Sequence, residues 1–179
     1  MLLQRTRATS VAPVWTEIVT RWPSPASLAA ADDDELRRVT SSLGLSWRIR
    51  LLREAARAIA RSVSGAVPDQ EEELRKLPGV GPYAASATVI MAFHGSGLVI
   101  DNNVVRVLSR LLGTPGGPEV RRRTWFARSV EPLAPTSRAR EVNLALLDLA
   151  ATTCQPKRPR CHLCPLASRC RYRFVSLDG

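Results

Sequence analysis

The residues best suited to chemistry include four cysteines near the end of the chain, spaced Cys-x6-Cys-x2-Cys-x5-Cys: Cys154, Cys161, Cys164 and Cys170. Four thiolates in so short a segment can hold one zinc ion or one [4Fe–4S] cluster. Zinc sites usually consist of two short pairs, and here only Cys161 and Cys164 form one. Disulfides are less favoured, because the N-terminus lacks the long apolar stretch of a secretory signal. The spacing therefore predicts a metal centre.

A second group of residues with chemical potential lies between Leu77 and Asp101. The run Pro-Gly-Val-Gly-Pro at 78–82 separates two helical segments. A turn with two glycines between helices exposes backbone N–H groups, which suits the binding of phosphate. Asp101 follows Gly81 by twenty residues and opens the next helix, where aspartate is also a favoured N-cap. We therefore expect a phosphate-binding turn followed by a carboxylate that could act on a bound substrate.

The elements that must position these residues are helical almost throughout. Apolar residues recur at helical spacing, and no segment shows convincing strand alternation. Asp69 and Glu72 have capping-box spacing and predict the start of a short helix before the turn. The longer helical segments cover residues 11–22, 35–43, 47–63, 82–93, 102–112, 119–130 and 138–153. The expected fold class is all-α.

The charge of the chain indicates a polyanionic partner. Its 179 residues include 26 Lys and Arg against 16 Asp and Glu, a net charge of +10. Lysine occurs only at Lys76 and Lys157, so the excess is almost all arginine. A GC-rich genome favours arginine codons, but that bias does not explain the shortage of acidic residues. Nucleic acid is the most common partner for such a surface.

The sequence contains no segment expected to enter a membrane. No stretch approaches the roughly 18 consecutive apolar residues of a membrane span. Because a secretory signal is also lacking, we expect a cytoplasmic protein that associates with the nucleoid.

The segments LPGVGPYAASA (77–87) and VIDNNVVRVLSRLLG (99–113), with the 6-2-5 cysteine spacing, resemble the helix-hairpin-helix (HhH-GPD) DNA glycosylase superfamily. The resemblance extends from Leu2 to Cys170 and is greatest to its endonuclease III-like members, in particular the thymine/guanine mismatch branch. It implies two all-α lobes and a [4Fe–4S] cluster. Residues 1–95 would form a helical barrel that contains the hairpin at 77–94. Residues 96–179 would form the cluster lobe.

The resemblance also implies catalytic roles for two residues. Asp101 matches the essential aspartate, whose carboxylate stabilises an oxocarbenium-like sugar and orients or deprotonates water. Tyr83 stands where bifunctional relatives have the lysine that forms a Schiff base, which a phenol cannot form. The nearest lysine, Lys76, precedes the hairpin on a different helix. We therefore expect base removal without strand cleavage, although Tyr83 could instead be a core residue.

The resemblance implies a monomer that binds double-stranded DNA containing a mismatched or damaged base, and it implies DNA-binding roles for further residues. The hairpin N–H groups would bind phosphates beside the damaged nucleotide. Leu45 matches an apolar wedge that enters the base stack, and Gln4 matches the region that fills the vacated space. Ordinary core and surface roles are the alternatives for these last two positions. The full set of expected DNA-binding residues is Gly79, Val80, Gly81, Gln4, Arg5, Leu45 and Arg48, the last on the basic face of helix 47–63.

Two departures from the family pattern bear on the substrate. Relatives usually begin earlier, with an additional N-terminal helix, and several have a glutamate just before the stretch that matches MLLQ. Adenine-removing relatives also carry an extra C-terminal domain. Adenine leaves poorly unless an acid protonates it, whereas thymine and uracil leave as stabilised anions and alkylated purines are already cationic. We therefore expect removal of T or U opposite G. Adenine opposite G or oxidised guanine, alkylated purines, and DNA binding without catalysis are the alternatives.

Overall fold

The computed structural model describes residues 1–3, 6–44, 46–134 and 137–177, and every regular element within these ranges is a helix. The all-α expectation is therefore confirmed. Internal packing divides the chain into two compact units, Met1–Ala85 and Ser86–Gly179. This division falls ten residues before the boundary expected after residue 95. The residues between the two boundaries pack with the second unit.

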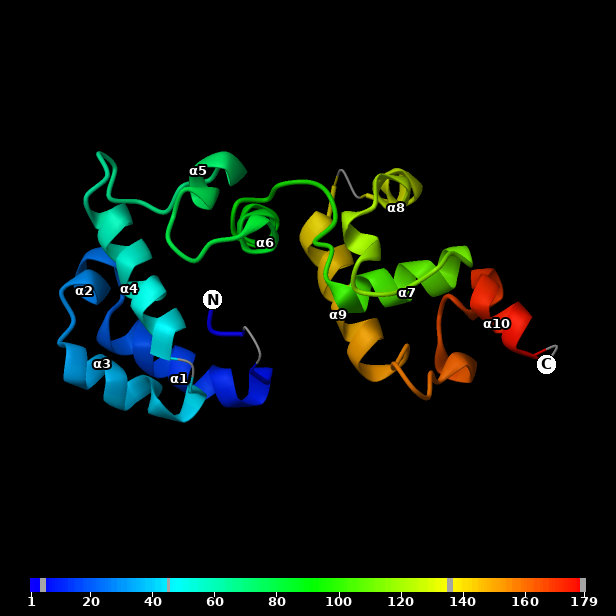
Figure 1. Cartoon of the computed structure of the whole chain (residues 1–179), viewed down its shortest axis with the longest axis horizontal. Helices are drawn as coiled ribbons and strands as arrows, with labels where there is room; N and C mark the ends of the chain where they lie inside the picture. Colours follow the sequence, from blue (N-terminus) through cyan, green and yellow to red (C-terminus); the bar gives the residue numbers. More distant parts are fainter. Residues whose placement is uncertain (4–5, 45, 135–136, 178–179) are drawn as a thin grey trace. The chain divides into compact units, whose positions relative to one another are not determined.

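The first unit is built on four helices around one apolar cluster (Figure 1). These are α1 (Ala8–Arg21), α2 (Pro25–Ala29), α3 (Asp33–Thr40) and α4 (Ser46–Ala60), with the 3-10 turn η1 (Ser41–Leu43) between the last two. The helices bury residues at helical spacing, such as Val11, Val14 and Ile18 of α1. The short α5 (Glu71–Arg75) precedes the hairpin, and α6 (Pro82–Ala92) begins in this unit and ends in the other.

The second unit is organised around α7 (Asn102–Leu112), which packs against α9 (Ala139–Thr152) and α10 (Arg171–Leu177). Val104, Val105 and Leu108 of α7 form its core with Phe126 of α8 (Thr124–Val130). Gly113 closes α7 in the left-handed conformation, with φ 66°. Four 3-10 turns complete the unit: η2 (Val120–Arg122), η3 (Glu131–Leu133), η4 (Cys161–Leu163) and η5 (Ala167–Arg169).

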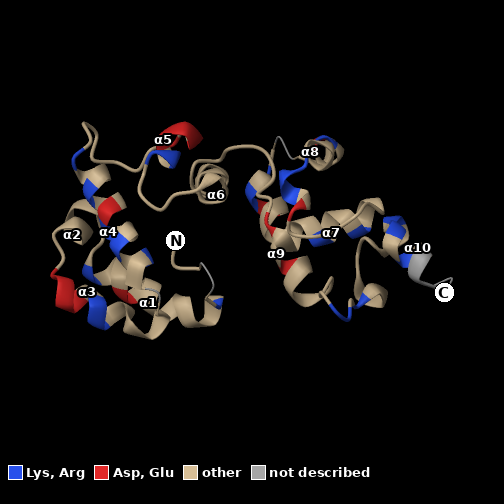
Figure 2. Cartoon of the chain, in the orientation of Figure 1, with Lys and Arg blue, Asp and Glu red and all other residues tan. Residues whose placement is uncertain are grey.

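Charged residues are distributed unevenly along these elements. Figure 2 shows basic residues along α4, on α7 and in the C-terminal part of the chain, whereas acidic residues gather on α5 and at the start of α3. Among the described residues, no helix has the length and apolar character needed to cross a lipid bilayer.

Candidate active site

Asp101, the expected catalytic residue, is the N-cap of α7. Its Oδ1 accepts the backbone N–H groups of Asn103 and Val104, each at 2.8 Å. Its Oδ2 accepts a further hydrogen bond from Asn103 Nδ2 at 3.0 Å. A carboxylate has about four acceptor sites, so these three bonds fix its orientation and leave about one for a water molecule. Capping α7 is therefore compatible with a role in chemistry.

The loop that leads to Asp101 is fixed by Asn143 of α9. This side chain is 1% exposed, and all three of its hydrogen bonds go to backbone groups. Its Oδ1 accepts the N–H of Val99 at 2.7 Å, while Nδ2 donates to the carbonyls of Gly97 and Ala139 at 2.9 and 2.8 Å. A buried amide satisfied in this way holds a loop in one conformation. Asn143 therefore supports the position of Asp101 from the neighbouring helix.

Arg106 connects the Asp101 carboxylate to the cysteine-rich segment. Its Nη1 donates to Asn103 Oδ1 at 2.9 Å, so Asn103 joins Arg106 on one side to Asp101 on the other. The same guanidinium donates from Nε to the carbonyl of Cys154 and from Nη2 to that of Ala150, both at 3.0 Å. One continuous chain of hydrogen bonds therefore runs from the carboxylate to the backbone of the first cysteine.

Arg110, one turn further along α7, holds the segment that follows Cys154. Its Nη1 donates to the carbonyl of Gln155 and its Nη2 to that of Pro156, both at 2.7 Å. Nη1 also lies 3.4 Å from Cys154 Sγ, and the guanidinium carbon lies 4.8 Å from the centre of the Tyr172 ring. This second arginine brings positive charge to a cysteine sulfur and fastens the loop to α7.

The four cysteines are half-buried free thiols that line a single pocket, which Arg110, Arg160 and Arg173 also line. Over the described ranges, no three His, Cys, Asp or Glu side chains are grouped closely enough to hold one metal ion. A [4Fe–4S] cluster is larger than a single ion, and each of its four irons takes one thiolate. Four thiols around one pocket, with arginines to balance the charge, therefore suit a cluster.

The hairpin has the geometry that its glycines predict. Gly79 has φ +73°, a backbone conformation that favours glycine. A Cβ added there would also collide with Met1 Cε and Leu51 Cβ, so both the conformation and the available space require glycine. The Val80 N–H closes the turn on the carbonyl of Leu77 at 3.1 Å. Among the described residues, no hydrogen bond joins the backbone N–H of Gly79 or Gly81 to a backbone carbonyl. Gly81 is exposed, so its N–H is accessible to an anion.

Tyr83 and Lys76 flank this hairpin. Tyr83 lies on the first turn of α6 and is 45% exposed, so it is not a core residue. Lys76 caps the C-terminus of α5, and its Nζ lies 2.5 Å from Glu73 Oε1. The hydrogen bond to Glu73 and the charge of that carboxylate raise the pKa of Lys76. The hairpin and Tyr83 belong to the first unit and Asp101 to the second.

Arg48 is not the surface residue that the sequence suggests. Its side chain is 0% exposed and donates to the backbone carbonyls of Leu2 and Leu43, so the expectation that it contacts DNA is corrected. Burial lowers the pKa of the Met1 amino group, and the neighbouring Arg48 charge lowers it further. The other expected base-reading positions, Gln4, Arg5 and Leu45, lie outside the described residues.

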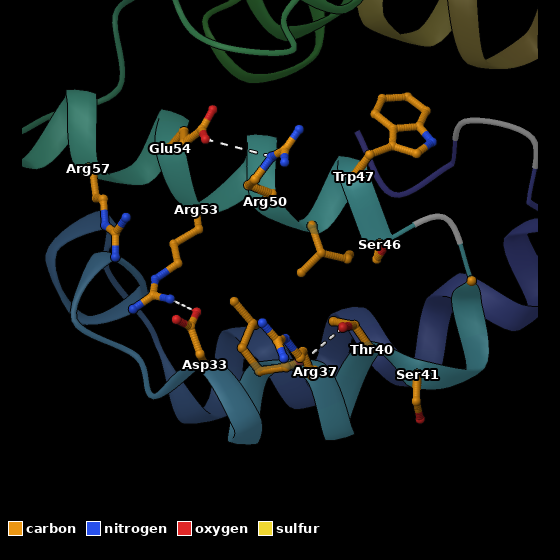
Figure 3. A pocket seen from close by; sticks show the side chains of 13 residues that line it. Asp33, Arg37, Thr40, Ser41, Ser46, Trp47, Arg50, Arg53, Glu54 and Arg57 are labelled. Atoms are coloured by element: carbon orange, nitrogen blue, oxygen red, sulfur yellow. Dashed lines mark hydrogen bonds and ion pairs between the residues drawn. The ribbon is translucent and has the colours of Figure 1, made fainter.

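A groove between α3 and α4 presents the exposed basic face of α4 (Figure 3). Its arginines are Arg37, Arg50, Arg53 and Arg57. Arg53 points toward α3 and pairs with Asp33. Arg37 and Arg50 are exposed and lie 3.9 Å from carboxylate oxygens of Asp34 and Glu54. Gly44 and Ser46, the neighbours of the expected wedge residue, also line this groove. The groove is therefore lined by basic side chains and by the two sequence neighbours of position 45.

Several residues that shape the site were not singled out from the sequence, namely Asn103, Arg106, Arg110 and Asn143. Asn103, Arg106 and Arg110 follow one another at intervals of three and four residues, the spacing of one helical face. That spacing is a signal that sequence reasoning could have used. Asn143 has no comparable pattern, because a buried amide and an exposed one look alike in a sequence.

The chain is similar in sequence to known DNA repair proteins. Residues 1–128 match the model of the HhH-GPD superfamily of base excision DNA repair proteins. A thymine/uracil-DNA glycosylase of Pyrobaculum aerophilum is 36% identical over 173 residues, which cover 94% of this chain and 75% of that protein. An adenine DNA glycosylase of Mycolicibacterium smegmatis is also 36% identical, over 99% of this chain and 60% of its own length.

The fold is also similar to that of a known DNA glycosylase. The solved structure of a thermostable thymine-DNA glycosylase superimposes with a TM-score of 0.87 and 29% identity, covering 97% of this chain and 81% of that one. The matched family model spans more than half of this chain, including the hairpin and the helix that Asp101 caps. The chain therefore belongs to the HhH-GPD superfamily of base excision DNA repair proteins.

Proposed function

We propose that this protein is a monofunctional DNA glycosylase that hydrolyses the N-glycosidic bond of T or U opposite G. The observation that carries the proposal is the Asp101 carboxylate, held by three hydrogen bonds at the start of α7. The similar proteins named as thymine/uracil and thymine-DNA glycosylases support this choice of base.

In this mechanism Asp101 acts on the sugar of a nucleotide that has been flipped out of the duplex. Positive charge develops on the sugar as the base leaves, and a fixed carboxylate stabilises that charge without having to reorganise. The remaining acceptor site of Asp101 orients water and takes its proton. Thymine and uracil leave as anions stabilised by their carbonyl groups, so this route requires no strong acid at the base.

The absence of lyase activity is proposed from the chemistry of the hairpin region. A lysine that forms a Schiff base must lose its proton, and enzymes achieve this by lowering its pKa. Lys76 has the opposite environment, because Glu73 raises its pKa. Tyr83 occupies the position of the lysine in bifunctional relatives, and a phenol forms no Schiff base with a sugar. We therefore propose that the product is an intact strand with an abasic site.

The hairpin and the cysteine pocket complete the proposal. The N–H groups of Gly79 and Gly81 would bind DNA phosphates, which the positive φ of Gly79 and the exposure of Gly81 favour. The Val80 N–H already donates to the Leu77 carbonyl, so its expected role as a phosphate donor is corrected. The four cysteines would hold a [4Fe–4S] cluster, which would act as a cross-link that orders the C-terminal segment. Arg106 and Arg110 would then transmit that order to α7.

A duplex panel tests the function directly. Labelled duplexes with T/G, U/G, A/G, A opposite oxidised guanine, and an alkylated purine are incubated with the protein and analysed with and without alkali. We expect strand breaks at T/G and U/G that require alkali, and their loss in Asp101→Asn. Breaks without alkali would contradict monofunctionality. Full activity of Asp101→Asn would contradict the assignment of Asp101, and binding without any abasic product would make the chain a DNA-binding module.

Adenine removal is the second function that an observation favours. The adenine DNA glycosylase of M. smegmatis is as similar in identity as the thymine/uracil enzyme, although this chain spans only 60% of its length. The same panel separates the two functions. Product from the adenine duplexes without product from T/G and U/G would replace the first proposal by the second.

A further inference from the structure

A second pocket of the second unit lies at the end of α7 opposite to Asp101, and we call it the α7–α10 pocket. Residues of α7, of the loop at 113–117 and of the start of α10 line it, and all of them belong to this unit. Its volume of about 440 Å³ falls within the range of small-molecule sites and far exceeds the roughly 30 Å³ of one water molecule. The pocket is therefore large enough for an organic ligand.

The charge of the α7–α10 pocket favours an anion. Arg106, Arg110 and Arg171 line it, and within the described chain no acidic residue does so. Arg106 and Arg110 already donate to Asn103 and to the backbone at 150–156, so they supply mainly charge. Arg171 is exposed, and its side chain has no hydrogen bond or ion pair to a described residue, so its donors are available. The C-terminus of α7 carries only about half a negative charge, which three guanidinium groups outweigh.

Thr114 adds a hydroxyl group that lacks a partner. Its Oγ1 is buried, and it makes no hydrogen bond in the part of the chain that the structure describes. The neighbouring Ser109 differs, because its Oγ donates to the Pro115 carbonyl at 3.1 Å. A buried hydroxyl without a partner loses its hydrogen bonds to water and gains none in return. A ligand oxygen in the pocket would supply the missing acceptor.

The loop after α7 adds two backbone donors. Gly116 and Gly117 are exposed, and over the described ranges neither N–H donates to a backbone carbonyl. Gly117 has φ +130°, and a Cβ built on it would meet no heavy atom within 4 Å, so the backbone is open to a bound group. Successive free N–H groups in a turn form concave sites for anions. The loop therefore presents donors where the arginines supply positive charge.

We propose that the α7–α10 pocket binds a small phosphate monoester through Arg171, Thr114 and the N–H groups of Gly116 and Gly117. A phosphate group offers several oxygens to donors that come from different elements, and its pairing with arginine is charge-assisted. The volume leaves room for the organic part, for which the Tyr172 ring and the arginine stems form apolar walls. The ligand would join α10 to the loop after α7. The inference goes beyond the proposed glycosylase function and does not rest on it.

Three variants of the full chain test the site. Thr114→Val removes the hydroxyl and nearly keeps the shape of the side chain. Arg171→Met removes the charge but keeps a stem beside Gly113, where an added Cβ would lie 3.0 Å from both Cβ and Cδ of Arg171. Arg140→Met is the matched control, because Arg140 is an exposed arginine of the same unit that does not line the pocket.

The ligand probe is thymidine 5′-monophosphate, with thymidine and inorganic phosphate as its two halves. Calorimetric titration gives the affinity of each probe for each variant. Melting temperatures with and without the nucleotide show whether the folded state is stabilised by binding. The affinity for an undamaged duplex is measured in the same buffer, so that a site for DNA phosphates is distinguished from a site for a small ligand.

We expect the wild type to bind the nucleotide more tightly than inorganic phosphate and to show no binding of thymidine. Thr114→Val and Arg171→Met should each weaken nucleotide binding by about tenfold, the factor that one hydrogen bond to a charged group supplies. Arg140→Met should stay within about twofold of the wild type. Without ligand, Thr114→Val should melt no lower than the wild type, because the hydroxyl that it removes is unpaired.

The inference fails if the wild type does not bind the nucleotide, or if Thr114→Val and Arg171→Met bind it as well as the wild type does, which would place the nucleotide elsewhere. Equal weakening by Arg140→Met would show unspecific charge attraction and would also overturn it. Binding of inorganic phosphate as tight as that of the nucleotide would overturn the monoester. Loss of duplex affinity in both pocket variants, without nucleotide binding by the wild type, would make the pocket a contact for DNA instead.

Discussion

Asn103 offers the sharpest test of how the proposed catalytic carboxylate of Asp101 is held. In the described part of the chain it is the one side chain that hydrogen-bonds to Asp101, through Nδ2 and Oδ2 at 3.0 Å. Asn103→Ala removes this bond but leaves the two backbone N–H bonds to Oδ1, so α7 stays capped. Because Asn103 is exposed, the free energy of unfolding should fall by no more than about 1.5 kcal/mol, the lower end of the contribution of a hydrogen bond to a charged group.

The expected loss of activity can be estimated from that single bond. A hydrogen bond to a charged group contributes about 1.5 to 3 kcal/mol. Water can partly replace an exposed amide, so the lower end of this range applies to Asn103. A loss of about 1.4 kcal/mol in transition-state stabilisation lowers a rate by roughly tenfold. We therefore expect the single-turnover rate of Asn103→Ala on a T/G duplex to fall about tenfold, with unchanged affinity for the duplex.

Coupling to Arg106 provides a second measurement in the same assay. Arg106 holds Asn103 Oδ1 at 2.9 Å, so Arg106→Met should also slow the reaction, and the double variant should lose less than the sum of the two single losses. Arg122→Met is the control, since it breaks only an exposed pair with Glu119 in the same unit. A wild-type rate for Asn103→Ala, or additive losses in the double variant, would refute the reasoning.

Three further predictions concern the hairpin, the groove and the cysteine pocket. Gly79→Ala should destabilise the protein by about 1–3 kcal/mol in thermal unfolding, because of its positive φ and the collision with Leu51 Cβ, whereas Gly81→Ala, with open space around it, should cost less. The double change Arg37→Ala and Arg50→Ala should make the salt dependence of DNA affinity shallower by about two units of slope, and an unchanged slope would exclude the groove as a phosphate site. Cys164→Ser should abolish the brown colour and lower the bound iron, and a colourless wild type with stoichiometric zinc would contradict the cluster.

The position of Asp101 could be predicted from the sequence because local signals agree there. An aspartate suited to capping precedes α7, apolar residues recur at helical spacing, and Gly113 ends the helix, so the predicted range of 102–112 is the observed one. The capping box at Asp69 and Glu72 failed as a signal, since α5 begins after Gln70 without a side-chain cap. The short α2 was not predicted, because five residues show no periodicity.

Arg48 shows that residue type alone does not predict which face of a helix is exposed. Five arginines between residues 48 and 61 indicate a solvated basic face, and most of them are exposed. Arg48, however, precedes the buried Ala55 and Ile59 by seven and eleven residues, which places it on the same face of α4. The spacing therefore contained the information, but the ordinary preference of arginine for solvent outweighs it unless the two carbonyl partners are known.

The arrangement of α7 predicts that the cysteine segment supports the proposed catalysis by Asp101. Asp101 caps the helix, and Arg106 and Arg110 follow on the side that binds the backbone at residues 150–156. If the segment after α9 loses its order, Arg106 loses the Cys154 carbonyl, one of the three acceptors that fix it, and its hold on Asn103 weakens. Disruption of the cysteine pocket should therefore slow base removal even where DNA is still bound through the hairpin, which belongs to the other unit.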